Sequence, residues 1–239
     1  MRARVVAAET LDGLAEADPA AMRARRDRRR VHRVMGTRRI LLRALRKWPA
    51  LRRQAGPLRV LELGAGDGSL LLGVARALRG EWPAVELGLL DRQALVDRST
   101  VARFAEIGWA ATTHVADVLD WAADANTPAP WDLIVANLFL HHFEARQLAA
   151  LLAAIEARCE RFLACEPRRG RLALAGSHLI GAIGANRVTR EDAVLSVRAG
   201  FRDAEIGSLW PAREARWTLN ESRAGLFSHC FCAERSERT

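Results

Sequence analysis

The chain has 239 residues, of which half are hydrophobic and 27% are charged, as in ordinary soluble globular proteins. No apolar run reaches the roughly 18 residues of a transmembrane helix, and the N-terminus lacks the apolar core of a signal peptide, so we expect a cytoplasmic protein. The four cysteines (Cys159, Cys165, Cys230 and Cys232) lack the spacing of a zinc site, and we expect core residues and no metal.

Positive charge is concentrated at the front of the chain. Residues 1–60 hold 17 of the 37 basic residues and 5 of the 28 acidic ones, a net charge of +12, whereas the remainder has a net charge of −3. Residues 22–51 carry apolar residues at helical spacing among arginines, with a break predicted at Gly36. Residues 54–57 are predicted as a linker. We therefore divide the chain into a basic helical N-terminal extension (residues 1–56) and a main domain (residues 57–239).

The main domain alternates short apolar runs with helical patterns. Apolar runs that are separated by helices predict a parallel sheet covered on both faces, and right-handed crossovers make it doubly wound. The predicted strands are Leu58–Leu63, Val85–Leu90, Ala111–Val115, Leu133–Leu138 and Arg161–Cys165, and the predicted helices are Ser69–Leu78, Ala94–Ile107 and Glu144–Ala157.

The tail is predicted to end the sheet differently. Trp217–Asn220 and Leu226–Cys232 read as strands joined by residues 221–225, a connection short enough for an antiparallel hairpin. The expected fold is thus an α/β, Rossmann-like, doubly wound and mostly parallel seven-stranded sheet with a C-terminal antiparallel hairpin and a helical N-terminal extension.

The sharpest motif lies where the first strand meets the first helix of the main domain. Glu62 is followed two residues later by the loop Gly64-Ala65-Gly66-Asp67-Gly68. Glycines let a backbone turn tightly and approach a ligand closely, as in dinucleotide-binding loops. The third glycine comes one residue earlier than in the dinucleotide fingerprint. A plain strand-to-helix turn would explain one glycine better than three.

Asp91 follows the second predicted strand, 23 residues beyond Gly68. An acid at this strand end can accept hydrogen bonds from both hydroxyls of a ribose. The competing interpretation is a surface ion pair with Arg92. The upstream glycine loop favours the ribose role.

The glycine loop resembles motif I of the class I S-adenosylmethionine-dependent methyltransferases, and five β/α units ending in a hairpin are similar to that superfamily's arrangement. The resemblance implies S-adenosyl-L-methionine as cofactor, bound by Glu62, the loop, Asp91 and Arg92. It also implies that Asp117 accepts a hydrogen bond from the adenine amine and that Val118 packs on the ring. A helix cap is the alternative role for Asp117.

The fourth strand runs into Asn137-Leu138-Phe139-Leu140-His141-His142, which resembles motif IV and its extension. Asn137 and Leu138 are expected to border the cofactor. The two prolines of the amino-methylating branches are missing, which argues against adenine, cytosine or glutamine nitrogen as acceptor. The segment resembles small-molecule methyltransferases of quinone and polyketide pathways. Residues 30–36 and 192–201 loosely resemble bacterial methyltransferases associated with type III polyketide synthases, in secondary metabolism.

Methyl transfer to an oxygen requires loss of a proton, and histidine has a suitable pKa for that work. His141 and His142 are therefore the candidate catalytic residues, one of them as base. Both could instead shape the pocket or cap a helix. The sequence does not show which of the two histidines would act as the base.

Three interpretations compete for the basic extension: a lid over the acceptor pocket, a peripheral contact with an anionic membrane surface, and a platform for RNA phosphates. We favour the lid, because no RNA-binding module is present and the body is mildly acidic; nucleic acid is the least favoured partner. The prediction is O- or C-methylation of a phenolic, quinone or polyketide-like small molecule. The alternatives are an RNA methyltransferase and a non-catalytic relative that binds the cofactor.

Overall fold

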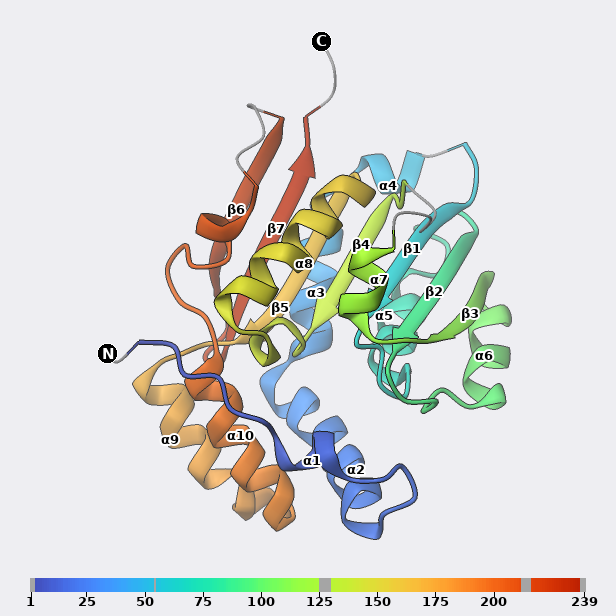
Figure 1. Ribbon diagram of the computed structural model, residues 1–239. Coiled ribbons are helices and arrows are strands. Elements are labelled where there is room, and N and C mark those ends of the chain that lie inside the picture. The colour runs from blue at the N-terminus through green and yellow to red at the C-terminus, as the bar shows by residue number, and fades with distance from the viewer. Residues whose placement is uncertain (1–2, 54, 125–129, 212–215, 237–239) are drawn as a thin grey trace.

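A seven-stranded sheet forms the centre of the molecule (Figure 1). The computed structural model describes residues 3–53, 55–124, 130–211 and 216–236, so residue 54 of the predicted linker lies outside the described part. The strand order is β3-β2-β1-β4-β5-β7-β6. The strands are β1 (Leu58–Leu63), β2 (Val85–Asp91), β3 (Trp109–Val115), β4 (Leu133–Asn137), β5 (Arg161–Pro167), β6 (Trp217–Ala224) and β7 (Ser228–Arg235).

Strands β1 to β5 pair in parallel, and β7 is antiparallel to both β5 and β6. The chain winds outward from β1 to β3 and then returns to place β4 on the other side of β1. This reversal creates a switch point at the carboxyl ends of β1 and β4, where open α/β sheets bind their ligands. The predicted fold class is confirmed.

Helices cover both faces of the sheet. The core on one face includes residues of α3, α5 and α6, and the core on the other face includes residues of α7 and α8. β4 is buried along its whole length, as expected for a central strand between two helical layers. The bounds are α3 (Thr37–Leu45), α5 (Ser69–Leu78), α6 (Arg98–Ala105), α7 (Val118–Ala123) and α8 (Ala145–Arg158).

The N-terminal extension is packed into this architecture. The helix α2 (Pro19–Met35) begins at Asp18, whose side chain accepts hydrogen bonds from two backbone amides, and ends at Gly36 with φ 68°. The predicted break at Gly36 is therefore confirmed. Beyond it, Leu41, Leu45 and Trp48 lie in the same core as β1 and α5. The short helix α4 (Ala50–Arg53) then leads to the sheet.

Four helices gather at the carboxyl end of the parallel strands (Figure 1). α10 packs against α9, α1 and α2. This group places the chain's first residues beside a segment almost 200 residues later. The remaining bounds are α1 (Thr10–Gly13), α9 (Arg171–Leu179) and α10 (Arg187–Ala199), with 3₁₀ helices η1 (Leu140–His142), η2 (Ile180–Ile183) and η3 (Gly207–Leu209).

Several predicted boundaries are wrong. β4 ends at Asn137 because Leu138 adopts a left-handed φ of 49°, which a strand does not allow. Residues 221–224 belong to β6, so the hairpin turns only at residues 225–227, where Gly225 has φ 68°. The helix predicted from residue 94 begins at Arg98, after the capping carboxylate of Asp97.

Candidate active site

The glycine loop between β1 and α5 is held by the end of β2. The amides of Gly64 and Ala65 donate to the Leu90 carbonyl at 2.9 and 3.1 Å. Gly64, Gly66 and Gly68 all have positive φ, a conformation that favours glycine. A Cβ atom at position 64 would overlap the ring of Phe139, whereas one at position 66 would meet nothing within 4 Å. Gly64 is thus needed for packing, and Gly66 faces open space.

Asp91 is tied to the glycine loop. Its Oδ2 accepts the Gly66 amide at 2.8 Å, and its Oδ1 accepts the Gln93 amide at 3.0 Å. A carboxylate has about four lone-pair sites, so both oxygens can still accept from a ligand. The half-buried Asp91 is therefore oriented toward the loop before any ligand arrives.

Glu62 in β1 and Asn137 at the end of β4 each carry an unpaired polar atom. Among the described residues, Glu62 Oε2 and Asn137 Oδ1 are buried and have no hydrogen-bond partner. Burial, and then the charges of Asp91 and Asp67, raise the pKa of Glu62 well above its usual value. Buried polar groups are normally paired, so these two atoms point to a missing ligand.

Asp117, Val118 and Arg92 border the other side of this region. Asp117 Oδ1 caps α7 by accepting the Leu119 amide at 2.7 Å, which is the capping role that the sequence left open. Val118 is buried. Arg92 donates to the Asp12 carbonyl and lies 3.4 Å from Asp12 Oδ1. Arg92 thus ties the start of the chain to the end of β2.

Most of the predicted residues line one cleft of about 520 Å³ at the ends of β1, β2 and β4. Gly68 does not line the cleft but sits at the N-cap of α5, and His141 lines a separate cavity. The predicted residues that line the cleft are Glu62, Gly64, Ala65, Gly66, Asp91, Arg92, Asp117, Val118, Asn137, Leu138 and His142.

Glu166 organises the turn after β4. Its side chain is fully buried, and Oε1 accepts the amides of Phe139 and Leu140, each at 3.0 Å. Its Oε2 accepts from His141 Nδ1 at 2.8 Å. Glu166 compensates for the loss of strand pairing where Leu138 turns. Sequence reasoning missed this role, because no local pattern links Glu166 to His141, 25 positions earlier.

The two adjacent histidines have different surroundings. His141 is buried, and its Nε2 lies 3.3 Å from Glu9 Oε1, so both ring nitrogens face carboxylates. Burial alone lowers the pKa of His141, but the hydrogen bonds to Glu166 and Glu9 outweigh it and raise this pKa to about 9. His142 lines the cleft, and its Nδ1 lies 3.2 Å from Asp12 Oδ2.

Residues 4–12, here called the N-terminal strap, cross the mouth of the cleft. Arg4 donates to the carbonyls of Ala199, His141 and Phe143 at 2.7 to 3.0 Å. Glu9 is buried and accepts from Ser196 and from Arg28. Burial raises the pKa of Glu9, but the hydrogen bond from His141 and the charges of His141, His142 and Arg28 together outweigh it and lower this pKa to about 2. The strap leads into the short helix α1, and its anchoring joins residues that lie far apart in the sequence.

The strap also brings together side chains of the kinds that can coordinate a metal ion. Glu9, His141 and His142 offer one carboxylate oxygen and two imidazole nitrogens within 4.8 Å of one another. The contacts seen there are ion pairs among the side chains themselves, as described above.

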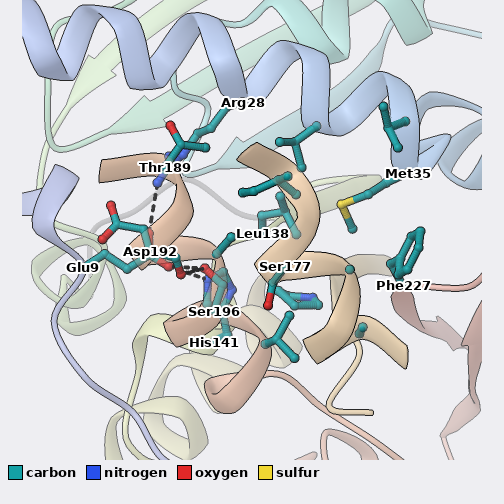
Figure 2. Close-up of a pocket in the computed structure, with 18 of the residues that line it drawn as sticks. Glu9, Arg28, Met35, Leu138, His141, Ser177, Thr189, Asp192, Ser196 and Phe227 are labelled. Atoms are coloured by element: carbon teal, nitrogen blue, oxygen red, sulfur yellow. Dashed lines mark hydrogen bonds and ion pairs between the residues drawn. The ribbon is translucent and has the colours of Figure 1, made fainter. Parts of the chain in front are cut away.

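A second cavity of about 160 Å³, here called the apolar chamber, lies between α2, α9 and α10. Figure 2 shows Glu9, Asp192 and Ser196 toward one end and Met35 and Phe227 at the other. Leu11, Arg28 and Leu138 line both the chamber and the cleft. The two cavities therefore share a wall at the charged end of the chamber, next to His141.

Within the described part of the chain, no helix is both long and apolar enough to cross a membrane. No family model and no curated protein sequence matches this chain.

Solved structures do match it in fold. The plantazolicin methyltransferase BpumL, in complex with a triazolic desmethyl-plantazolicin analogue and SAH, has a TM-score of 0.66 at 11% identity, over 92% of this chain and 93% of its own. Magnesium protoporphyrin IX methyltransferase from Synechocystis PCC 6803, with bound SAH, has a TM-score of 0.53 at 14% identity, over 95% and 91%. The S-adenosylmethionine-dependent methyltransferase SibL has a TM-score of 0.53 at 20% identity, over 82% and 55%. The chain therefore has the fold of the class I S-adenosylmethionine-dependent methyltransferases.

Proposed function

We propose that this protein is an enzyme that transfers a methyl group from S-adenosyl-L-methionine to a small molecule. The observation that carries the proposal is the cleft at the ends of β1, β2 and β4, in which a glycine loop is surrounded by acids from three strand ends. Its likeness in fold to methyltransferases with bound SAH supports the same cofactor. The acceptor we propose is phenolic, quinone or polyketide-like, methylated on oxygen or carbon.

The cleft residues fit this cofactor. Asp91 would accept from the ribose hydroxyls, and the side-chain-free Gly66 would let the ligand approach the backbone. An ammonium group beside Glu62 would satisfy its unpaired Oε2 and favour the ionised carboxylate. Asp117 would take the adenine amine on the oxygen that does not cap α7, with Val118 against the ring.

The bound cofactor supplies an electrophilic methyl group; the protein must align the acceptor and remove a proton. We propose His142 rather than His141 as the base. Both nitrogens of His141 are occupied by carboxylates, so it has no free lone pair. His142 lines the cleft, Asp12 fixes its Nδ1 side, and among the described residues its Nε2 has no hydrogen-bond partner.

We propose that the N-terminal strap and α2 together form the lid over the acceptor site. The arginines of α2 that line the cleft are used within the molecule: Arg25 donates to Glu16 and Gln93, Arg28 pairs with Glu9, and Arg29 lies 3.4 Å from Asp67. These contacts hold the cleft-facing side of α2 against the rest of the molecule, and this arrangement favours the lid over an RNA platform. The peripheral membrane contact stays a prediction.

Calorimetric titration with S-adenosylhomocysteine tests the cofactor assignment. We expect one saturable site, and Asp91→Ala should weaken binding about tenfold or more, because a charged hydrogen-bond acceptor is lost. Asp120→Ala, in the first turn of α7 outside the cleft, is the matched control and should bind normally. Unchanged affinity in Asp91→Ala would refute the ribose assignment. Transfer of labelled methyl groups to a metabolite extract rather than to total RNA tests the acceptor class.

A further inference from the structure

The apolar chamber carries an inference about the acceptor, which rests on the function proposed above. We infer that the acceptor is an uncharged molecule with one aromatic ring, whose hydroxyl group lies at the charged end of the chamber. The size of the chamber, the charges in its wall and its position beside the cleft each support this inference.

The volume of the chamber limits the size of the acceptor. The chamber holds about 160 Å³, and an apolar cavity of roughly 150 Å³ accommodates one benzene molecule. The side chains at the far end, Met35 and Phe227, are apolar (Figure 2). Ala173 and Gly176 leave space on the α9 side, and a Cβ atom at position 176 would lie 2.9 Å from the Phe227 ring. A single ring with a short substituent matches this volume more closely than two fused rings do.

The charges in the chamber wall limit the charge of the acceptor. Among the described residues of the wall, the side chains that carry positive charge are Arg28 and His141, and both are already paired with carboxylates. Asp192 adds a further carboxylate, held by the amides of Thr10 and Leu11. An anionic acceptor would lose its hydration and meet carboxylates without an unpaired cation. A neutral hydroxyl instead can donate a hydrogen bond to a carboxylate.

A polar partner for the acceptor is present in the wall. Thr189 lines the chamber, and its buried Oγ1 has no hydrogen-bond partner among the described residues. Figure 2 places Thr189 beside Arg28, at the end of the chamber that adjoins the cleft. A hydroxyl at this end would satisfy Thr189 and lie at the boundary with the cofactor cleft, because Leu11, Arg28 and Leu138 line both cavities. The reacting oxygen would thus reach the methyl donor, while the ring stays in the apolar end.

Three probes separate these limits: 4-ethylphenol (one ring, neutral), 2-naphthol (two rings, neutral) and 4-hydroxybenzoate (one ring, anionic). Each is titrated calorimetrically into protein saturated with S-adenosylhomocysteine. We expect 4-ethylphenol to bind at least about tenfold more tightly than either of the others. Equal or tighter binding of 2-naphthol or 4-hydroxybenzoate would overturn the inference.

Two variants locate the binding. Ala173→Leu should fill the chamber and abolish 4-ethylphenol binding with S-adenosylhomocysteine affinity unchanged, because Ala173 does not line the cleft. Met35→Ala should enlarge the apolar end and improve 2-naphthol binding at least about tenfold. If Ala173→Leu does not fold, Met35→Phe fills the chamber from the α2 side and should have the same effect. Unchanged phenol binding in a folded filling variant would refute the location.

The proposed function and the inference about the acceptor can be refuted separately. Loss of S-adenosylhomocysteine binding in the wild-type protein would refute the proposed function. Normal S-adenosylhomocysteine binding without any 4-ethylphenol binding would refute the acceptor inference alone.

Discussion

The buried cluster of Glu9, His141 and Glu166 should make the stability of the protein depend on pH above neutrality. The pKa of His141 is about 9 in the folded protein and about 6.5 in an unfolded chain. This difference corresponds to about 3 kcal/mol of free energy of unfolding. Because the folded pKa is the higher one, the contribution is fully present below pH 6.5 and is lost as the pH rises through 9.

The assay is urea unfolding at pH values from 6 to 10, with the free energy of unfolding extrapolated to zero denaturant. We expect wild type to lose about 3 kcal/mol more than His141→Asn over this range, because the variant lacks the titrating group. The matched control is His142→Asn, which leaves both carboxylate contacts of His141 intact and should follow wild type. Glu9→Gln removes one of the two carboxylates and should flatten the pH dependence in part.

The same pH dependence in wild type and His141→Asn would refute the reasoning. It would mean that His141 is neutral in the folded protein at pH 7. Both ring nitrogens of His141 would then not be donors to carboxylates, and His141 would again be a candidate for the base.

Three further predictions follow from the contacts of the site. In urea unfolding, Gly64→Ala should lower the free energy of unfolding by about 2–4 kcal/mol and Gly66→Ala by only about 1 kcal/mol. Both positions have positive φ, but only a Cβ atom at position 64 would collide with the Phe139 ring. Equal losses in the two variants would contradict this prediction. Arg4→Ala should speed hydrogen exchange of the Thr10 amide about tenfold, since the strap loses its anchor on backbone carbonyls, and an unchanged rate would show that the strap is held elsewhere. His142→Ala should reduce turnover by about 10²- to 10⁴-fold if it is the base, and full turnover would exclude that role.

Local patterns predicted the sheet and most of the candidate residues that line the cleft. A parallel strand followed by a glycine loop constrains its own geometry, and the carboxyl ends of successive strands necessarily meet at one edge. For this reason Glu62, Asp91 and Asn137 could be placed together from sequence alone. Gly68 is the exception within the loop: the same φ that suits a ligand-binding turn suits the N-cap of α5.

The anchoring of the N-terminal strap and the apolar chamber could not be predicted in the same way. The ion pair between Glu9 and His141 joins residues 132 positions apart, and Asp192 holds Thr10 and Leu11 across 182 and 181 positions. No periodicity in either segment encodes such a contact. The different surroundings of His141 and His142 follow from the 3₁₀ helix η1, in which consecutive side chains point in different directions and here line different cavities.

A crystal structure of the protein with S-adenosylhomocysteine tests the central claim most directly. We predict that the ribose hydroxyls lie within hydrogen-bond distance of the Asp91 carboxylate, that the adenine ring contacts Val118 and that the amino group reaches Glu62. An empty glycine loop at saturating ligand, or preferential binding of a nicotinamide dinucleotide at these strand ends, would contradict the account.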